Sequence, residues 1–367
     1  MRLVVFAWLA CSGCDALFHL DHVPLPGDGT SGSDATLGDG AGGTNLVFVS
    51  SQTVVPASLG GAAGADALCT SLATRAGHPG TYVAWLGTST KSAPLRIGTT
   101  ARGWVRADGR PFADTVVDIV QGNVWYPLRL TETGEDVGAG SAADLTVVTG
   151  TNADGTTGST TCGDFTTATI QGVSAGLADN APYGWSSNMG AACTSSVRLY
   201  CFGVDRVEPV SLTPESTRRA FITLDAYPIG GGIAALDQAC AVDATSFHLT
   251  GTFKAAVATT TQSALSRFAP GAPWVRPDGV TAIDSSGSIV TPIELDGGGG
   301  NEQVGVAWAG APSLIAKSPT SAASCYDWTR ADGTLGLTGN YSRSAGEAFG
   351  GIPNTCNNMM HVYCLQD

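Results

Sequence analysis

The residue pattern in this chain that most resembles catalytic chemistry is a serine between glycines. Gly172-Val-Ser-Ala-Gly176 matches the nucleophile-elbow pattern, in which a strand precedes the serine, a helix follows it, and Asp and His come later. Pro182 would end such a helix early, and the next histidine after His78 is His248, in the second half of the chain. We therefore expect no catalytic residues and predict that the protein is not an enzyme.

Motifs for metals and cofactors are missing from the sequence as well. It has no His-Glu-x-x-His motif, no glycine-rich phosphate loop ending in lysine and no dinucleotide fingerprint. His19 and His22 have no further ligand nearby, and Asp28, Asp34 and Asp39 lie in a glycine-rich stretch typical of a solvated linker. We expect no bound metal ion and no cofactor.

One stretch that organises the chain occurs twice. Residues 60–86 and 231–257 align without a gap, and each predicts a short helix, a glycine turn and a strand. In the first copy, Ala65, Cys69 and Leu72 recur at helical spacing and form an apolar face. Identical residues in both copies are Asp66 and Asp237, Cys69 and Cys240, Gly80 and Gly251, and Thr81 and Thr252.

Eight cysteines repeat with this duplication. They are Cys69, Cys162, Cys193 and Cys201, then Cys240, Cys325, Cys356 and Cys364, and the last two gaps are 31 and 8 residues in both copies. No pair has the short spacing of zinc ligands. Four cysteines allow three pairings, and spacing does not choose among them. Because a helix cysteine must be tied to a distant element, we favour the nested pairs Cys69–Cys201, Cys162–Cys193, Cys240–Cys364 and Cys325–Cys356.

The N-terminus has the pattern of an export signal. Met1-Arg2 precedes the apolar run Leu3–Ala10, and Ser12-Gly-Cys14 is similar to a lipobox, although Cys11 stands where leucine is expected. We predict a signal peptide over residues 1–14 and a lipid on Cys14, with Cys11 as the rival position. The expected location is the outer membrane, cell surface or periplasmic face, and plain secretion is the alternative. The lipid is the only membrane contact that we expect, since no other segment approaches the ~18 apolar residues of a membrane span.

Composition divides the rest of the chain. We predict a flexible tether over residues 15–43, one domain over 44–206, a linker over 207–217 and a second domain over 218–367. Strands are expected to open the domains at Leu46–Ser50 and Phe221–Leu224. Gly297–Gly300 predicts a loop that the first domain lacks. The net charge of −13, with only three lysines, argues against nucleic-acid partners, which need clustered cations.

Several spaced segments resemble a known family. They are Gly60–Cys69, Ala76–Leu86, Cys162-Gly-Asp-Phe-Thr166 and Leu199-Tyr-Cys201, and they are similar to endostatin and closer to related bacterial lipoprotein domains of unknown function. Those domains belong to the C-type-lectin-like superfamily. The resemblance covers Asn45–Asp205 well and Arg218–Asp367 less well. It implies an α+β chain of two tandem C-type-lectin-like domains, with nested disulfides and paired first and last strands.

The resemblance does not extend to calcium-dependent sugar binding. Ile352-Pro-Asn354 and Trp185-Ser-Ser-Asn188 lack the carboxylates of the calcium motifs and lie in the wrong order or domain. The run Thr149–Gly155 does match the bacterial relatives, and this implies a ligand loop with Asn152 and Asp154, to which we add Trp185 in a later loop. The alternative for this run is an Asx turn.

The second domain has lost these candidate positions, with Ala309–Ser313 and Ala348 in their places. We therefore expect the first domain to carry any recognition function. The predicted function is an exported, lipid-anchored recognition or adhesion protein that binds an extracellular protein or carbohydrate without catalysis. A passive structural protein of the bacterial envelope is the first alternative, and a secreted hydrolase is the second.

Overall fold

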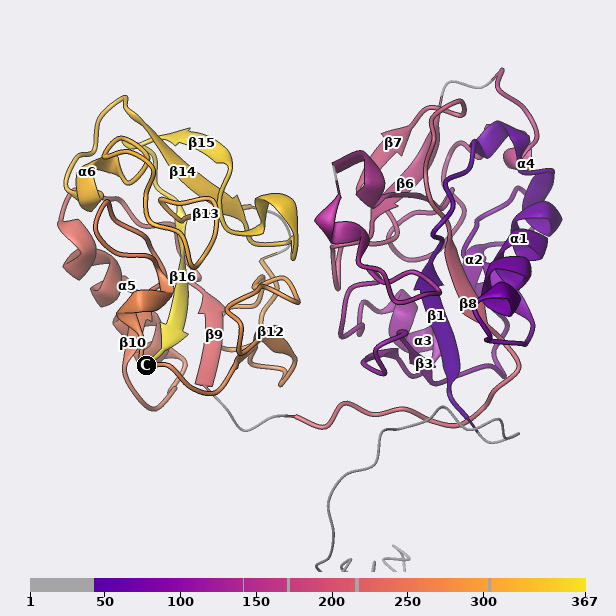
Figure 1. Ribbon diagram of the computed structural model, residues 1–367, viewed down its shortest axis with the longest axis horizontal. Helices are drawn as coiled ribbons and strands as arrows, with labels where there is room; N and C mark the ends of the chain where they lie inside the picture. The colour runs from indigo at the N-terminus through magenta and orange to yellow at the C-terminus, as the bar shows by residue number, and fades with distance from the viewer. Residues whose placement is uncertain (1–42, 141, 170–171, 215–217, 303–304) are drawn as a thin grey trace, which may run out of the picture. The chain divides into compact units, whose positions relative to one another are not determined.

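The duplication seen in the sequence is a duplication of structure. The computed structural model describes residues 43–140, 142–169, 172–214, 218–302 and 305–367, which include two α+β repeats (Figure 1). We call residues 44–206 repeat 1 and residues 218–367 repeat 2. Among the described strands, each pairs only with strands of its own repeat. The predicted signal peptide, Cys11, Cys14 and the tether up to residue 42 lie outside the described residues.

Repeat 1 contains a five-stranded sheet in the order β2-β8-β1-β3-β4 and a three-stranded sheet in the order β5-β6-β7. Its strands are β1 (Asn45–Val49), β2 (Tyr82–Ala84), β3 (Trp104–Val105), β4 (Pro111–Ala113), β5 (Thr146–Val148), β6 (Val173–Leu177), β7 (Met189–Ala191) and β8 (Tyr200–Gly203). Its helices are α1 (Gly61–Arg75), α2 (Ala93–Ile97), α3 (Val116–Val120) and α4 (Cys162–Phe165), with short 3-10 turns η1 (Pro56–Ser58), η2 (Val137–Ala139) and η3 (Ala142–Leu145).

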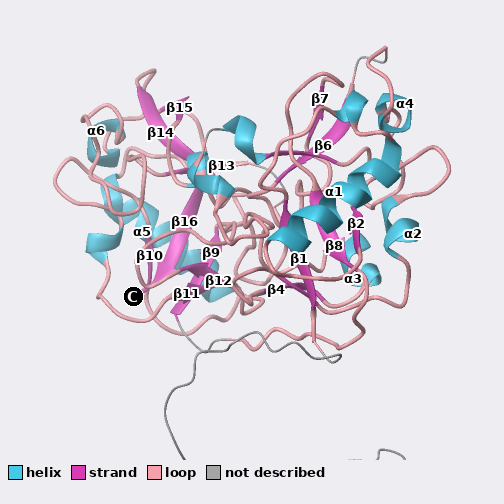
Figure 2. Ribbon diagram, turned by 45° about the vertical axis from the view of Figure 1, so that its right-hand side comes forward, coloured by secondary structure: helices cyan, strands magenta, loops and turns pink. Residues whose placement is uncertain are grey.

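Repeat 2 contains the same strands joined in one sheet, ordered β12-β11-β9-β16-β13-β14-β15, with β10 also paired to β16. Its strands are β9 (Arg218–Ile222), β10 (Phe253–Ala255), β11 (Trp274–Val275), β12 (Thr281–Ile283), β13 (Val306–Trp308), β14 (Leu335–Asn340), β15 (Ile352–Thr355) and β16 (His361–Gln366). Its helices are α5 (Gly232–Ser246) and α6 (Cys325–Trp328), with turns η4 (Leu265–Arg267) and η5 (Gly346–Ala348). Long loops connect these short elements (Figure 2).

The first and last strands of each repeat pair with each other. In repeat 1, β1 and β8 are antiparallel, with Val47 opposite Phe202. In repeat 2, β9 and β16 pair in the same way, with Phe221 opposite Cys364. The predicted strand at Phe221–Leu224 is displaced, because β9 begins at Arg218 and ends at Ile222.

The long helix of each repeat packs on its sheet through a small apolar face. Ala65, Cys69, Leu72 and Ala73 of α1 are buried. The helix entry needs glycine, since a Cβ at Gly64 would lie 1.9 Å from the Leu59 carbonyl oxygen. The helix therefore approaches the preceding backbone more closely than a side chain would allow.

The duplicated aspartate of this helix joins it to the neighbouring strand. The amide of Ala84 in β2 donates to Asp66 Oδ1 at 2.9 Å, and the amide of Ala255 in β10 donates to Asp237 Oδ1 at 2.9 Å. Each aspartate also forms an ion pair with an arginine, Arg96 at 2.5 Å and Arg267 at 2.7 Å. A charge-assisted contact repeated at equivalent positions explains why Asp66 and Asp237 coincide in the sequence.

Four disulfides have the nested pairing favoured from the sequence. They are Cys69–Cys201, Cys162–Cys193, Cys240–Cys364 and Cys325–Cys356. The outer bridge of each repeat ties the long helix to the last strand. The inner bridge ties α4 or α6 to the segment just before that strand.

The inner bridge begins at a left-handed turn in both repeats. Cys162, Gly163, Asp164 and Phe165 all have φ between 52° and 66°, and residues 325–328 have φ between 48° and 69°. Left-handed helical backbone costs roughly 1–2 kcal/mol for each non-glycine residue. The Asp164 carboxylate accepts a bond from Ser89 N at 2.8 Å, and Asp327 accepts one from Thr260 N at 3.0 Å. These bonds and the adjacent disulfide hold the turn in place.

The structure describes part of the predicted linker and corrects the expectation for Gly297–Gly300. In the described part of the predicted linker, Val210 N donates to Asp114 Oδ1 of repeat 1 at 2.9 Å. Gly297–Gly300 is no extra loop. Its hairpin pairs Leu295 with Asn301, and repeat 1 has a turn of the same length between Leu130 and Asp136. The described residues of both repeats belong to one compact unit.

Glu294 of repeat 2 is fully buried without a hydrogen bond. Neither carboxylate oxygen has a hydrogen-bond partner among the described residues, and the nearest cationic atom is Arg276 Nη1 at 4.0 Å. Arg276 is itself bonded to Asp278 and to the Pro292 carbonyl. Burial therefore raises the pKa of Glu294 well above its ordinary value of 4.5, although Arg276 opposes the shift.

This burial predicts a pH-dependent stability. Because the folded state holds the Glu294 proton more tightly, the free energy of unfolding should fall as the pH rises above 4.5. Glu294→Gln should remove that part of the slope and be more stable at pH 7 by on the order of 1 kcal/mol. Urea unfolding between pH 4.5 and pH 8 measures this, with exposed Glu208→Gln as the control. Parallel stability curves for wild type and Glu294→Gln would contradict the prediction.

Candidate functional site

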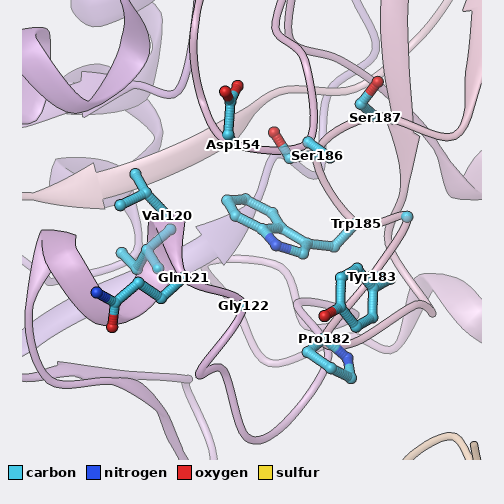
Figure 3. Close-up of a pocket in the computed structure, with 12 residues that line it drawn as sticks. Val120, Gln121, Gly122, Asp154, Pro182, Tyr183, Trp185, Ser186 and Ser187 are labelled. Atoms are coloured by element: carbon cyan, nitrogen blue, oxygen red, sulfur yellow. The ribbon is translucent and has the colours of Figure 1, made fainter. Parts of the chain in front are cut away.

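Two of the three predicted ligand residues lie in one pocket of repeat 1. Asp154 and Trp185 both line it, whereas Asn152 does not. The pocket is formed by three separate segments: the end of α3, the turn after β5 and the loop between β6 and β7 (Figure 3). Its lining residues are Ile119, Val120, Gln121, Gly122, Ala153, Asp154, Pro182, Tyr183, Gly184, Trp185, Ser186 and Ser187.

The pocket is small. Its volume is about 190 Å³, whereas sites for whole drug-sized ligands measure about 300–1,000 Å³. The space therefore suits one ring or one side chain of a larger ligand. In Figure 3 the Trp185 indole lies at the centre, with Asp154 and Ser186 on one side and Tyr183 and Pro182 on another.

Trp185 forms the floor of the pocket and belongs to the core. Its side chain is 2% exposed and packs against Trp85, Phe112 and Tyr200 at ring-centroid distances of 5.2, 5.2 and 5.4 Å. A ligand can therefore reach only the edge of the indole.

The counterpart of Trp185 in repeat 2 is Phe349, and the expectation of Ala348 was wrong. The ring of Phe349 lies 5.6 Å from Tyr363, the residue equivalent to Tyr200. Each of the two aromatic residues also has its carbonyl against a strand glycine, Gly176 or Gly339. An aromatic floor is thus a property of both repeats and does not distinguish repeat 1.

Asn152 is a turn residue. Its carbonyl accepts from Gly155 N at 3.0 Å, and its side-chain amide donates to Thr156 Oγ1 at 3.0 Å and to the Thr157 carbonyl at 3.3 Å. These bonds close the hairpin that carries Asp154. The Asn152 side chain therefore supports the hairpin as a donor, whereas the bond of an Asx turn, from the amide two residues later to the side-chain oxygen, is made by Asp154 with Thr156 N at 3.0 Å.

Asp154 provides the negative charge of the pocket. Its Oδ1 accepts from the Thr156 hydroxyl at 2.6 Å and from the Thr156 amide at 3.0 Å. These bonds hold the pKa of the Asp154 carboxyl below its usual value. The carboxylate is exposed and ionised at neutral pH, and Oδ1 carries both of these bonds, so Oδ2 can accept a hydrogen bond from a ligand.

The serines of the pocket differ in their availability. Ser186 is buried, and its hydroxyl accepts from Trp85 Nε1 at 2.9 Å and bonds to Thr151 Oγ1 at 2.7 Å. Ser187 is only partly buried, near the mouth. No histidine, lysine or arginine is among the twelve described lining residues, and the one carboxylate among them, Asp154, bonds to Thr156 and to neither serine.

The serine of the nucleophile-elbow pattern lies elsewhere. Ser174 is inside β6, which pairs with β5 on one side and with β7 on the other. Its carbonyl accepts from the amides of Thr149 and Gly150 at 3.1 and 2.9 Å. A strand position between two neighbours is not the strand-to-helix turn of an elbow.

The sequence analysis did not predict that the end of α3 lines the pocket, where it contributes Val120 and Gln121. A signal for this helix was present at its start. The Thr115 side chain accepts from Asp118 N and the Asp118 side chain accepts from Thr115 N, which is a capping box. Nothing in the sequence connected this helix with Tyr183, which is 36% exposed and whose ring lies beside Gly122.

The described residues contain neither a metal-binding cluster nor a membrane-spanning helix. Among the residues that the structure describes, no three His, Cys, Asp or Glu side chains are grouped to hold a metal ion. No described helix is both long and apolar enough to span a bilayer. Neither a family model nor a curated protein matches the chain.

Proposed function

We propose that the chain is an exported recognition protein whose ligand site is the pocket of repeat 1. The observation that supports this most is the meeting of an ionised carboxylate, accessible polar groups and an exposed tyrosine over a rigid aromatic floor. Such a mixture of apolar surface and few convergent polar groups is typical of binding sites. Neither serine of the lining is hydrogen-bonded to Asp154, the one carboxylate there, which favours binding over catalysis.

An extracellular carbohydrate is the ligand class that the pocket chemistry favours, ahead of a protein side chain. Asp154, Gln121 and Ser187 can accept from or donate to hydroxyl groups, and the ring of Tyr183 offers a flat apolar face. No cationic residue lines the pocket, so phosphate and nucleic-acid ligands are disfavoured. The volume admits a single sugar ring of a longer chain.

The proposed fold family is the C-type-lectin-like superfamily, with both repeats as members. The nested disulfides, the helix after the first strand and the pairing of the terminal strands support this assignment. The pocket has a single carboxylate, so its binding would be independent of calcium.

The proposed location is the cell envelope, with the chain anchored through a lipid on Cys14. Four buried disulfides favour an oxidising compartment. Metabolic labelling with a fatty-acid analogue should mark the wild-type chain and leave Cys14→Ser unlabelled. Equal labelling of both chains would show that Cys14 is not the anchor.

Array binding tests the recognition function. The full chain should bind a subset of neutral glycans on a glycan array at physiological salt, and Tyr183→Ala should weaken that binding at least about tenfold, because it removes the exposed ring. Tyr326→Ala is the matched control, since this repeat 2 tyrosine is 38% exposed and outside the pocket. Undiminished binding by Tyr183→Ala would exclude the pocket, and silence on glycan and matrix-protein arrays would favour a structural role.

Two variants of the hairpin distinguish a residue that contacts the ligand from one that only stabilises the turn. Asp154→Asn keeps an acceptor for Thr156 and removes the charge, so it should weaken binding with little change in stability. Asn152→Ala should lower the free energy of unfolding by about 1 kcal/mol and leave binding intact. The reverse pattern would show that Asn152 is the contact residue.

A further inference from the structure

The loop that carries half of the pocket begins at a buried aspartate. Asp179 lies three residues before Pro182, at the start of the segment that continues through Ser187. Its side chain is fully buried, although no described residue of repeat 1 forms an ion pair with it. A buried carboxylate needs a charged or hydrogen-bonded partner. The part of the chain that provides this partner for Asp179 therefore fixes the start of the loop.

The partner is an arginine of repeat 2. Arg343 Nε donates to Asp179 Oδ2 at 2.9 Å, and Arg343 Nη2 donates to Asp179 Oδ1 at 3.3 Å. Arg343 is itself 9% exposed. Two parallel bonds between a guanidinium and a carboxylate fix direction as well as distance.

The backbone of Asp179 is held by the next residue of repeat 2. The Ser344 amide donates to the Asp179 carbonyl at 3.0 Å, and the Ser344 hydroxyl donates to the same oxygen at 2.9 Å. On the other side, Arg129 of repeat 1 donates to the Ser344 carbonyl at 2.5 Å. Arg129 is oriented by its ion pair with Asp136. Carboxylate and carbonyl of Asp179 thus have partners in two consecutive residues of repeat 2.

We propose that Arg343 and Ser344 are positioning residues for the pocket of repeat 1, so that repeat 2 acts as a clamp on the loop from Asp179 to Ser187. This inference rests on the proposed function for its importance in binding. It keeps the proposed ligand site in repeat 1 and adds that repeat 2 holds one of its loops. A pocket of this size tolerates little displacement of Tyr183 or Pro182, and the clamp lies only three residues from Pro182.

Hydrogen–deuterium exchange on the full chain tests the clamp without a ligand. In Arg343→Ala, amides of residues 179–187 should exchange at least about tenfold faster than in wild type, while amides of β1 and β9 keep their rates. Arg330→Ala is the matched control, because Arg330 of repeat 2 is exposed, pairs with Asp332 and stacks on Tyr326. Arg330→Ala should leave the amide exchange rates of residues 179–187 unchanged.

A milder variant guards against loss of folding. Arg343→Lys keeps the charge but loses the two-bond geometry, so exchange of the loop should be intermediate. Unchanged exchange of residues 179–187 in Arg343→Ala would overturn the clamp, and so would an equal rise throughout both repeats. Faster loop exchange combined with silent arrays would support the clamp and remove the proposed recognition function instead.

Discussion

The fold of each repeat depends on one covalent constraint, the bridge between the long helix and the last strand. Cys69 and Cys201 are both fully buried, and β8 lies between β2 and β1, so one bond fastens α1 to an inner strand of the sheet. The bridge closes 132 residues in repeat 1 and its counterpart closes 124 in repeat 2. Loops of that length correspond to about 5 kcal/mol in the chain-entropy description, which is comparable to the whole stability of a small domain. Long irregular loops are tolerated because their ends are fixed.

Much of this frame could be predicted from the sequence, because duplication reveals which residues recur. The helix at Gly61–Arg75 and the strand after Gly80–Thr81 followed from positions that coincide in two copies. The nested pairing of the cysteines needed a further argument, that a helix cysteine must be tied to a distant element. The left-handed turns did not follow. Aspartate and glycine tolerate positive φ, but Phe165 and Trp328 show no local preference for it, and their conformation is imposed by burial of their rings and by the adjacent disulfide.

The candidate site was predictable only in part. Asp154 and Trp185 line the pocket, but Asn152 is engaged in its own turn and Trp185 has an aromatic counterpart one residue beyond the expected position. Tyr183 lies in the same loop as Trp185, but Gln121 follows α3, and only folding brings that segment beside the loop. The pair Asp179–Arg343 joins residues 164 positions apart and has no sequence pattern that distinguishes it from a surface charge pair. Comparison of the two copies identifies the residues that both repeats share. It does not identify Tyr183, Gln121 or the pair Asp179–Arg343, because these positions differ between the repeats.

The central claim is that two independent disulfide frames position the loops of the chain, and non-reducing peptide mapping tests it most directly. After free thiols are blocked, protease digestion and mass spectrometry should link Cys69 to Cys201 and Cys162 to Cys193. The same experiment should link Cys240 to Cys364 and Cys325 to Cys356. Loss of these linked peptides on reduction would complete the expected result. A bridge from any cysteine of repeat 1 to one of repeat 2, or a pairing of Cys69 with Cys193, would contradict the account.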